Sequence, residues 1–294
     1  MRAFPLAAAL TVSLSSICFA SVYAMQTPTP VATPSPYSYA DIADLATIAP
    51  ITIHARIYSS AVLKPEQAPG LKAGQARFYI EADVVGLIRG AGPLASRVNY
   101  LVDLPLDAKG KPVKPKKKQP VLLFARPVAG NAPGANSTAS IRLVAPDAQL
   151  PWDPATEARL RAILTELVKP GAPPAITGVA NGFHVPGTLP GEGETQLFLD
   201  TRTGEPVSLT ILTAADGSRR WAAAFGEIVD GSAAVPPRDT LAWYRLACGL
   251  PRQLPLAKLA GTEPEDRKKA ASDYAVVLGA LGECTRTRTP PTGS

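Results

Sequence analysis

The sequence predicts an α+β protein: a small antiparallel β barrel or sandwich, then an antiparallel β meander packed with about three helices. Three observations predict this class. Apolar and polar residues alternate in the first half, strand-like runs separated by tight turns fill the second half, and apolar stripes at helical spacing flank those runs. Of the 294 residues, 46% are hydrophobic and 18% are charged, so the chain has enough apolar material for a sizeable core.

The N-terminus has the features of a secretory signal peptide over residues 1–24. Arg2 precedes a mostly apolar run, and small residues lead to a cleavage site expected after Ala24, with Ala20 as the alternative. Residues 25–38 are rich in proline and are expected to form an extended tether. We therefore expect an exported, soluble protein, periplasmic or secreted, with no transmembrane segment in the mature chain.

The cysteines fit an oxidising compartment. Loss of the signal would remove Cys18 and leave Cys248 and Cys284, which predicts one structural disulfide. Neither of the two lies in a Cys-x-x-Cys motif, so redox catalysis is not expected. With only two histidines and three cysteines, the sequence contains no zinc-finger or iron–sulfur pattern, and we expect no metal and no cofactor.

Residues 39–150 are expected to form the barrel or sandwich. Strict alternation over residues 51–57 and 77–88 predicts two half-buried strands. Further strands are expected at 97–104, 121–128 and 140–144. The domain is OB-like by strand count only, because nothing between the third and fourth strands predicts the helix usual there.

Residues 151–284 are expected to form the α+β domain. Asp153 and Pro154 are typical of a helix start, and residues 169–171 should end that helix. The meander strands are expected at 195–200, 207–213 and 219–229.

Two helices should close the second domain. The first is expected over residues 239–248, and the second should begin at a capping box formed by Thr262 and Glu265 and stop at Gly282. Residues 285–294 are expected to form a disordered tail.

A lysine-rich loop lies between the third and fourth predicted strands. Its cations are Lys109, Lys111, Lys114, Lys116, Lys117 and Lys118. They would suit an anionic polymer or an envelope component. The loop contains no aromatic residue for base stacking, so nucleic acid is disfavoured as a partner. The alternative is a solvated hairpin that keeps a sheet edge from aggregating.

A second candidate is the stretch 182–195, rich in glycine and proline and expected to be a loop before a strand. His184 with Glu192 or Glu194 would supply a base and its orienting carboxylate. No nucleophile motif accompanies these residues, so an ordinary structured loop is the alternative.

A third candidate is the outer face of the first sheet, which would suit a cation or a sugar. Its polar residues are His54, Arg56, Tyr58, Arg77, Tyr79, Glu81, Asp83, Asn99 and Asp103. A half-exposed sheet carries such alternating residues as a rule, which is the structural alternative.

The sequence resembles no functional family and carries no signature of a known reaction. The leading hypothesis is a non-catalytic, envelope-associated binding module for an anionic polymer or a protein partner. The alternative hypothesis is a hydrolase that acts on an envelope or extracellular substrate through the stretch around His184. A concave pocket holding His184 beside a carboxylate or hydroxyl would favour the hydrolase.

Overall fold

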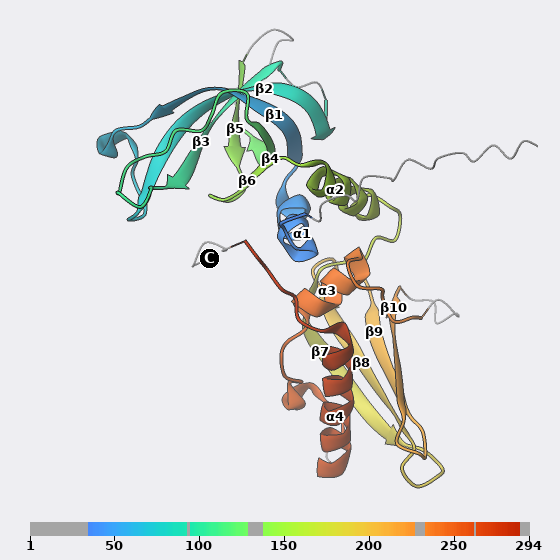
Figure 1. The fold of residues 1–294 in the computed structure, drawn as a ribbon. Coiled ribbons are helices and arrows are strands. Elements are labelled where there is room, and N and C mark those ends of the chain that lie inside the picture. Colours follow the sequence, from blue (N-terminus) through green and yellow to red (C-terminus); the bar gives the residue numbers. More distant parts are fainter. Residues whose placement is uncertain (1–34, 93–94, 129–137, 227–232, 262, 289–294) are drawn as a thin grey trace, which may run out of the picture. The chain divides into compact units, whose positions relative to one another are not determined.

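The computed structural model describes residues 35–92, 95–128, 138–226, 233–261 and 263–288 (Figure 1). The expected signal peptide and most of the tether lie outside these residues. Contacts divide the chain into residues 1–33 and 34–294, and the second unit is described here. The α+β class is confirmed, with a six-stranded and a four-stranded sheet among the described residues. None of the described helices is long and apolar enough to span a bilayer.

The six-stranded sheet contains every strand predicted for the first half. Its strands are β1 (Ile51–Val62), β2 (Gln75–Arg89), β3 (Arg97–Pro105), β4 (Pro120–Pro127), β5 (Thr138–Leu143) and β6 (Gln149–Pro151). They pair in the order β1-β2-β3-β5-β4-β6, and β1 also pairs with β4. Five of the strands therefore form a ring of neighbouring pairs in the order β1-β2-β3-β5-β4, and β4 pairs with β1 again. Because β5 pairs only briefly with β3 and with β4, the result is a partly open, OB-like barrel.

Alternation separates the two faces of this barrel. In β2, Phe78 and Ile80 point into the interior core, while Arg77 and Tyr79 point outward. Strand β4 differs because both of its faces are buried: Leu123 belongs to the barrel interior, whereas Leu122 belongs to the larger core that the helices share. Burial on both faces explains the unbroken apolar run in this strand.

All four described helices contribute to that larger core, and the first two lie next to the barrel strands in sequence. Helix α1 (Tyr39–Ile48) was not expected; it begins at a capping box in which Ser38 and Asp41 exchange hydrogen bonds. Helix α2 (Pro154–Leu167) begins as predicted, with Asp153 accepting a hydrogen bond from the Thr156 amide. The shared core contains residues on both sides of residue 151, and the expected domain boundary there stays a prediction.

The four-stranded sheet contains the three strands of the expected antiparallel meander and one strand, β7, that was not expected, in the order β10-β9-β8-β7. Its strands are β7 (Ile176–Pro186), β8 (Gly193–Thr201), β9 (Val207–Thr213) and β10 (Arg219–Phe225). The expectation of a loop over 182–195 was wrong, because β7 and β8 extend into it and leave only residues 187–192 as a turn. Glycine at position 182 lets β7 pack closely against β8, because a Cβ there would lie only 2.8 Å from the Gln196 carbonyl oxygen.

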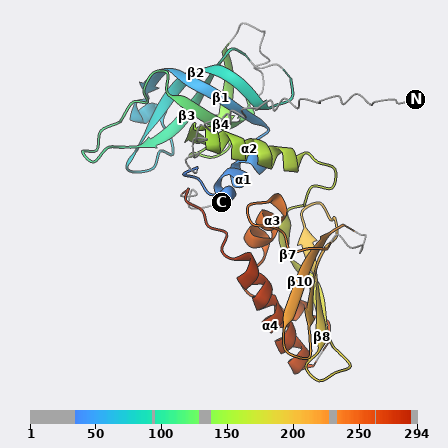
Figure 2. The same cartoon turned by 45° about the vertical axis from the view of Figure 1, so that its right-hand side comes forward.

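Helix α3 (Leu241–Gly249) and helix α4 (Pro264–Leu281) follow the meander, and α4 lies along β7 (Figure 2). Short 3₁₀ turns occupy η1 (Pro65–Gln67) and η2 (Leu256–Lys258). The N-cap of α4 is Glu263 rather than the expected Thr262, which lies outside the described residues. The predicted disulfide is confirmed: Cys248 and Cys284 join the C-terminal ends of α3 and α4, with their Cα atoms 5.2 Å apart.

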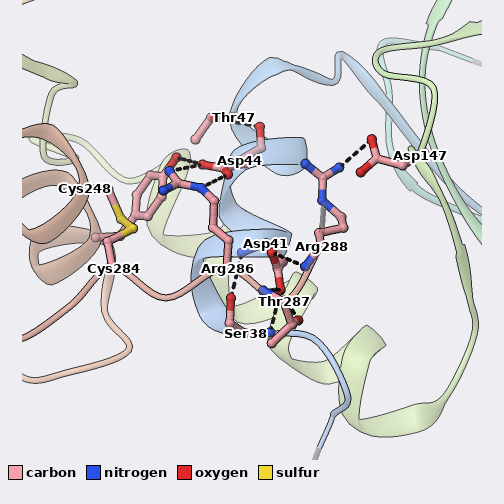
Figure 3. A network of polar contacts seen from close by, with 11 residues as sticks. Ser38, Asp41, Asp44, Thr47, Asp147, Cys248, Cys284, Arg286, Thr287 and Arg288 are labelled. Carbon is pink, nitrogen blue, oxygen red and sulfur yellow. Dashed lines mark hydrogen bonds and ion pairs between the residues drawn. A yellow bond between two sulfur atoms is a disulfide. The ribbon is translucent and has the colours of Figure 1, made fainter. Parts of the chain in front are cut away.

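Residues 285–288 correct the expected disordered tail. They follow the disulfide and contact α1 and the segment before β6 (Figure 3). The physical reason is that Asp41, Asp44 and Asp147 offer carboxylates that the backbone and side chains of this segment hydrogen-bond or pair with. We call residues 285–288 the C-terminal strap. Residues 289–294 lie outside the described residues.

Candidate functional site

A groove is lined by residues of β2, β3 and β5 and by the segment that follows β5. It consists of two adjoining hollows of about 520 and 680 Å³ that share Arg77, Val102, Asp103 and Pro146. We call this the barrel groove. Its polar lining residues are Tyr37, Lys72, Gln75, Arg77, Tyr79, Asn99, Asp103, Ser140, Arg142, Asp147, Gln149 and Arg288.

Strand alternation places these side chains in the groove. Asn99 and Asp103 of β3 lie on the outer face because Tyr100 and Val102 fill the barrel interior. Pairing then sets Arg77 of β2 directly opposite Asp103. The predicted outer face thus forms a groove wall over Arg77, Tyr79, Asn99 and Asp103.

The centre of the groove is a bidentate ion pair. Arg77 Nε lies 2.6 Å from Asp103 Oδ1, and Nη2 lies 2.8 Å from Oδ2. The third guanidinium nitrogen, Nη1, donates to the Pro69 carbonyl at 3.0 Å. Hydrogen bonding to Asp103 raises the pKa of Arg77, so this side chain stays charged. The pair gives the groove wall one fixed donor and one fixed acceptor.

One end of the groove is lined by chain segments far apart in sequence. Lys72 comes from the β1–β2 connection, Asp147 and Gln149 from the region of β6, and Arg288 from the C-terminal strap. Arg288 Nη1 lies 3.1 Å from Asp147 Oδ1. No local sequence signal identifies Asp147, Gln149 or Arg288 as groove residues, because only the fold brings them to β2 and β3.

The lysine-rich loop connects β3 to β4. The Asp107 carboxylate accepts hydrogen bonds from the backbone amides of Lys109 and Lys111, which shapes the turn. The loop begins at the same barrel end as Lys72, since the Leu106 amide donates to the Gly74 carbonyl at 2.9 Å. All six lysines are exposed, and no carboxylate among the described residues lies within ion-pair distance of them.

His184 lies elsewhere, under α4, in a buried polar network. Its Nδ1 is 2.9 Å from Thr195 Oγ1, which donates to Asp273 Oδ2 at 2.6 Å. Arg219 Nε lies 3.0 Å from the other oxygen of Asp273. The side chains of His184 and Asp273 are 5% and 1% exposed, so a substrate has no direct access to them.

The two expected carboxylate partners of His184 do not join this network. Glu192 accepts a hydrogen bond from the Leu189 amide within the β7–β8 turn. Glu194 accepts one from the Gln196 side chain at 2.6 Å. Glu194 is the strand neighbour of Thr195, and alternation places it on the opposite face of the sheet from the residues that contact α4.

The hydrogen-bond directions in the buried network do not suit nucleophilic catalysis. The Thr195 hydroxyl has a single hydrogen, which it donates to Asp273, so towards His184 Nδ1 it can only accept. A histidine acting as a base accepts the hydroxyl proton of its nucleophile, the reverse of this arrangement. The geometry is that of a structural link between α4 and the meander.

His54 is also separated from the groove. Its ring stacks on Trp152 with centroids 4.6 Å apart, and its Nδ1 lies 3.5 Å from Glu157 Oε2. Burial lowers the pKa of His54, and this effect exceeds the opposing influence of Glu157. Glu81 instead accepts a hydrogen bond from Ser59, and no group of metal-ligating side chains occurs among the described residues.

No protein-family model matches this sequence, and no curated protein matches it. The function is therefore inferred from the geometry of the chain itself.

Proposed function

We propose that this chain is an exported, non-catalytic binding module that holds an anionic polymer along the barrel groove. One observation carries the proposal: two adjoining hollows lined by β2, β3 and β5 form a groove that ends beside Lys72 and shares a barrel end with the lysine-rich loop. An extended polyanion can lie in the groove while its charges meet the exposed lysines.

The groove chemistry favours an acidic polysaccharide. Tyr79, Asn99 and Ser140 offer neutral donors and acceptors to hydroxyl groups, and Arg77 with Asp103 offers a charged donor and acceptor side by side. The lysines act as point charges for carboxylates or sulfates. The lysine-rich loop has no aromatic platform, which disfavours single-stranded nucleic acid.

The fold adds support by analogy. OB-folds bind oligosaccharides and oligonucleotides on the face of their second and third strands, and β2 and β3 form the groove here. A shared architecture does not establish a shared function. The chemistry of the groove therefore carries more weight than this analogy.

Export is part of the proposal. The features of residues 1–24 favour it, and the disulfide between Cys248 and Cys284 suits an oxidising compartment. The burial of His184 and Asp273 disfavours the alternative, a hydrolase that acts through His184.

The first test is a binding titration with a fluorescently labelled oligogalacturonate, read by anisotropy at several salt concentrations. The variant with Lys114, Lys116, Lys117 and Lys118 all changed to Gln should lose at least about tenfold in affinity and show a shallower salt dependence, because fewer counterions are released on binding.

The matched control changes four exposed lysines outside the barrel to Gln: Lys169, Lys258, Lys268 and Lys269. This control should bind like the wild type. Equal losses of affinity in both variants would show that binding depends only on the net charge of the protein. Wild-type affinity in the loop variant would show that the lysine-rich loop is not part of the binding site.

A further inference from the structure

We propose that Arg288 is an anion-binding residue of the barrel groove and that the C-terminal strap holds it there. The inference rests on the proposed binding function and names a contact within it. The ligand group is a carboxylate or sulfate of the bound polymer, at the end of the groove where Lys72 and Tyr37 lie.

The strap is anchored before it reaches the groove. Cys284, the residue before the strap, is bonded to Cys248 at the end of α3. Two residues later, Arg286 Nε lies 2.6 Å from Asp44 Oδ2 (Figure 3). The Tyr244 hydroxyl of α3 donates to the same carboxylate at 2.7 Å. The disulfide and this pair fix the path of the strap along α1.

The backbone at Arg288 is fixed independently of its own side chain. The amides of Thr287 and Arg288 donate to the two oxygens of Asp41, each at 3.0 Å. Asp41 is fully buried and also caps α1 through Ser38. A change in the Arg288 side chain therefore leaves these backbone anchors in place.

The Arg288 guanidinium has donors to spare. Its side chain is 9% exposed, and among the described residues its carboxylate partner is Asp147, with Nη1 3.1 Å from Oδ1. Nε and Nη1 of Arg288 make no hydrogen bond with any described group, nor do the two carboxylate oxygens of Asp147. These polar atoms are buried, so a carboxylate or sulfate that enters this end of the groove must displace Asp147 to take the hydrogen bonds that the Arg288 guanidinium can donate.

The two arginines of the strap have different surroundings. Arg286 makes two hydrogen bonds with Asp44 and does not line the groove. Arg288 lines the groove together with Lys72 and Arg77. We infer that Arg286 anchors the strap, whereas Arg288 contacts the ligand.

The test measures the affinity of the full chain for two labelled probes, an oligogalacturonate for carboxylate and a heparin oligosaccharide for sulfate. Arg288→Gln should lose about tenfold or more, because it removes charge-assisted hydrogen bonds. Arg288→Lys should lose less. Asp147→Asn should gain affinity, because it removes a competing carboxylate from the groove. The probe with the larger loss on Arg288→Gln identifies the anionic group.

The exposed Arg252, outside the groove lining and the strap, provides the charge-matched control: Arg252→Gln should bind like the wild type. If Arg288 were only structural, Arg288→Gln and Asp147→Asn would both weaken binding, and that result overturns the inference. Wild-type affinity in Arg288→Gln also overturns it, while the proposed function stands. No binding of either probe by the wild type overturns both proposals. If Arg288→Gln fails to fold, Arg288→Lys and Asp147→Asn decide the outcome.

Discussion

Asp41 shows how one buried carboxylate serves two structures. It caps α1 through the Ser38 amide, and it accepts hydrogen bonds from the amides of Thr287 and Arg288. Burial by itself would raise the pKa of Asp41. The hydrogen bonds from Thr287, Arg288 and Ser38 outweigh burial and lower the pKa below its ordinary 3.8.

This shift predicts how acid acts on the fold. Because the pKa of Asp41 is lower in the folded than in the unfolded state, the unfolded chain binds more protons as the pH falls through this range. The stabilisation is therefore present above pH 3.8 and is lost as the pH falls through the folded pKa.

Asp41→Asn should lose about 1–3 kcal/mol of unfolding free energy at pH 7, since buried donors lose their acceptor. Its deficit relative to the wild type should shrink in acid. Urea unfolding at pH 7 and pH 3 measures both quantities. A deficit that is the same at the two pH values would show that the charge of Asp41 is not what stabilises the strap.

Functional side chains could be predicted where they are close together in the sequence, but not where the fold brings distant residues together. The lysine-rich loop is contiguous, and the structure leaves its side chains exposed. His184 was matched to Glu192 and Glu194 because they are close in sequence. Its network partner Asp273 is far away in the chain, and no local pattern connects them.

Strands and helices were predicted correctly in segments where apolar residues recur with a single clear period. The strands of the barrel were predicted because apolar residues alternate in them. Helix α1 was missed, although Ser38 and Asp41 form a capping-box signal directly before Ile42 and Leu45. Strand β7 was missed as a whole, and its C-terminal half was assigned to a loop because Gly182 and Pro186 resemble loop residues.

The disulfide between Cys248 and Cys284 joins the ends of α3 and α4. Changing Cys248 and Cys284 to Ala should lower the unfolding free energy by about 3–4 kcal/mol in the chain-entropy model, given a sequence separation of 36 residues. Chemical denaturation of the two proteins measures the difference. A loss below about 1 kcal/mol would mean that the contacts of the strap with α1 hold these helix ends without the bond.

The groove depends on the order in which the strands pair and on the path of the C-terminal strap. Its walls come from β2, β3 and β5, and its end comes from the β1–β2 connection and the C-terminal strap. The α+β class and the outward direction of Arg77 and Asp103 were predictable from alternation. The approach of Arg288 to Asp147 was not, because it depends on the pairing order of the strands and on the path of the strap.

Hydrogen–deuterium exchange of backbone amides, with and without an oligogalacturonate that binds, locates the ligand site on the chain. Binding in the barrel groove predicts slower exchange in the 63–74 connection, in β2 and β3, and in the lysine-rich loop, with no change in β7 to β10. Slower exchange confined to the meander and α4 would contradict ligand binding in the barrel groove. The ligand site would then lie beside His184 rather than in the barrel groove.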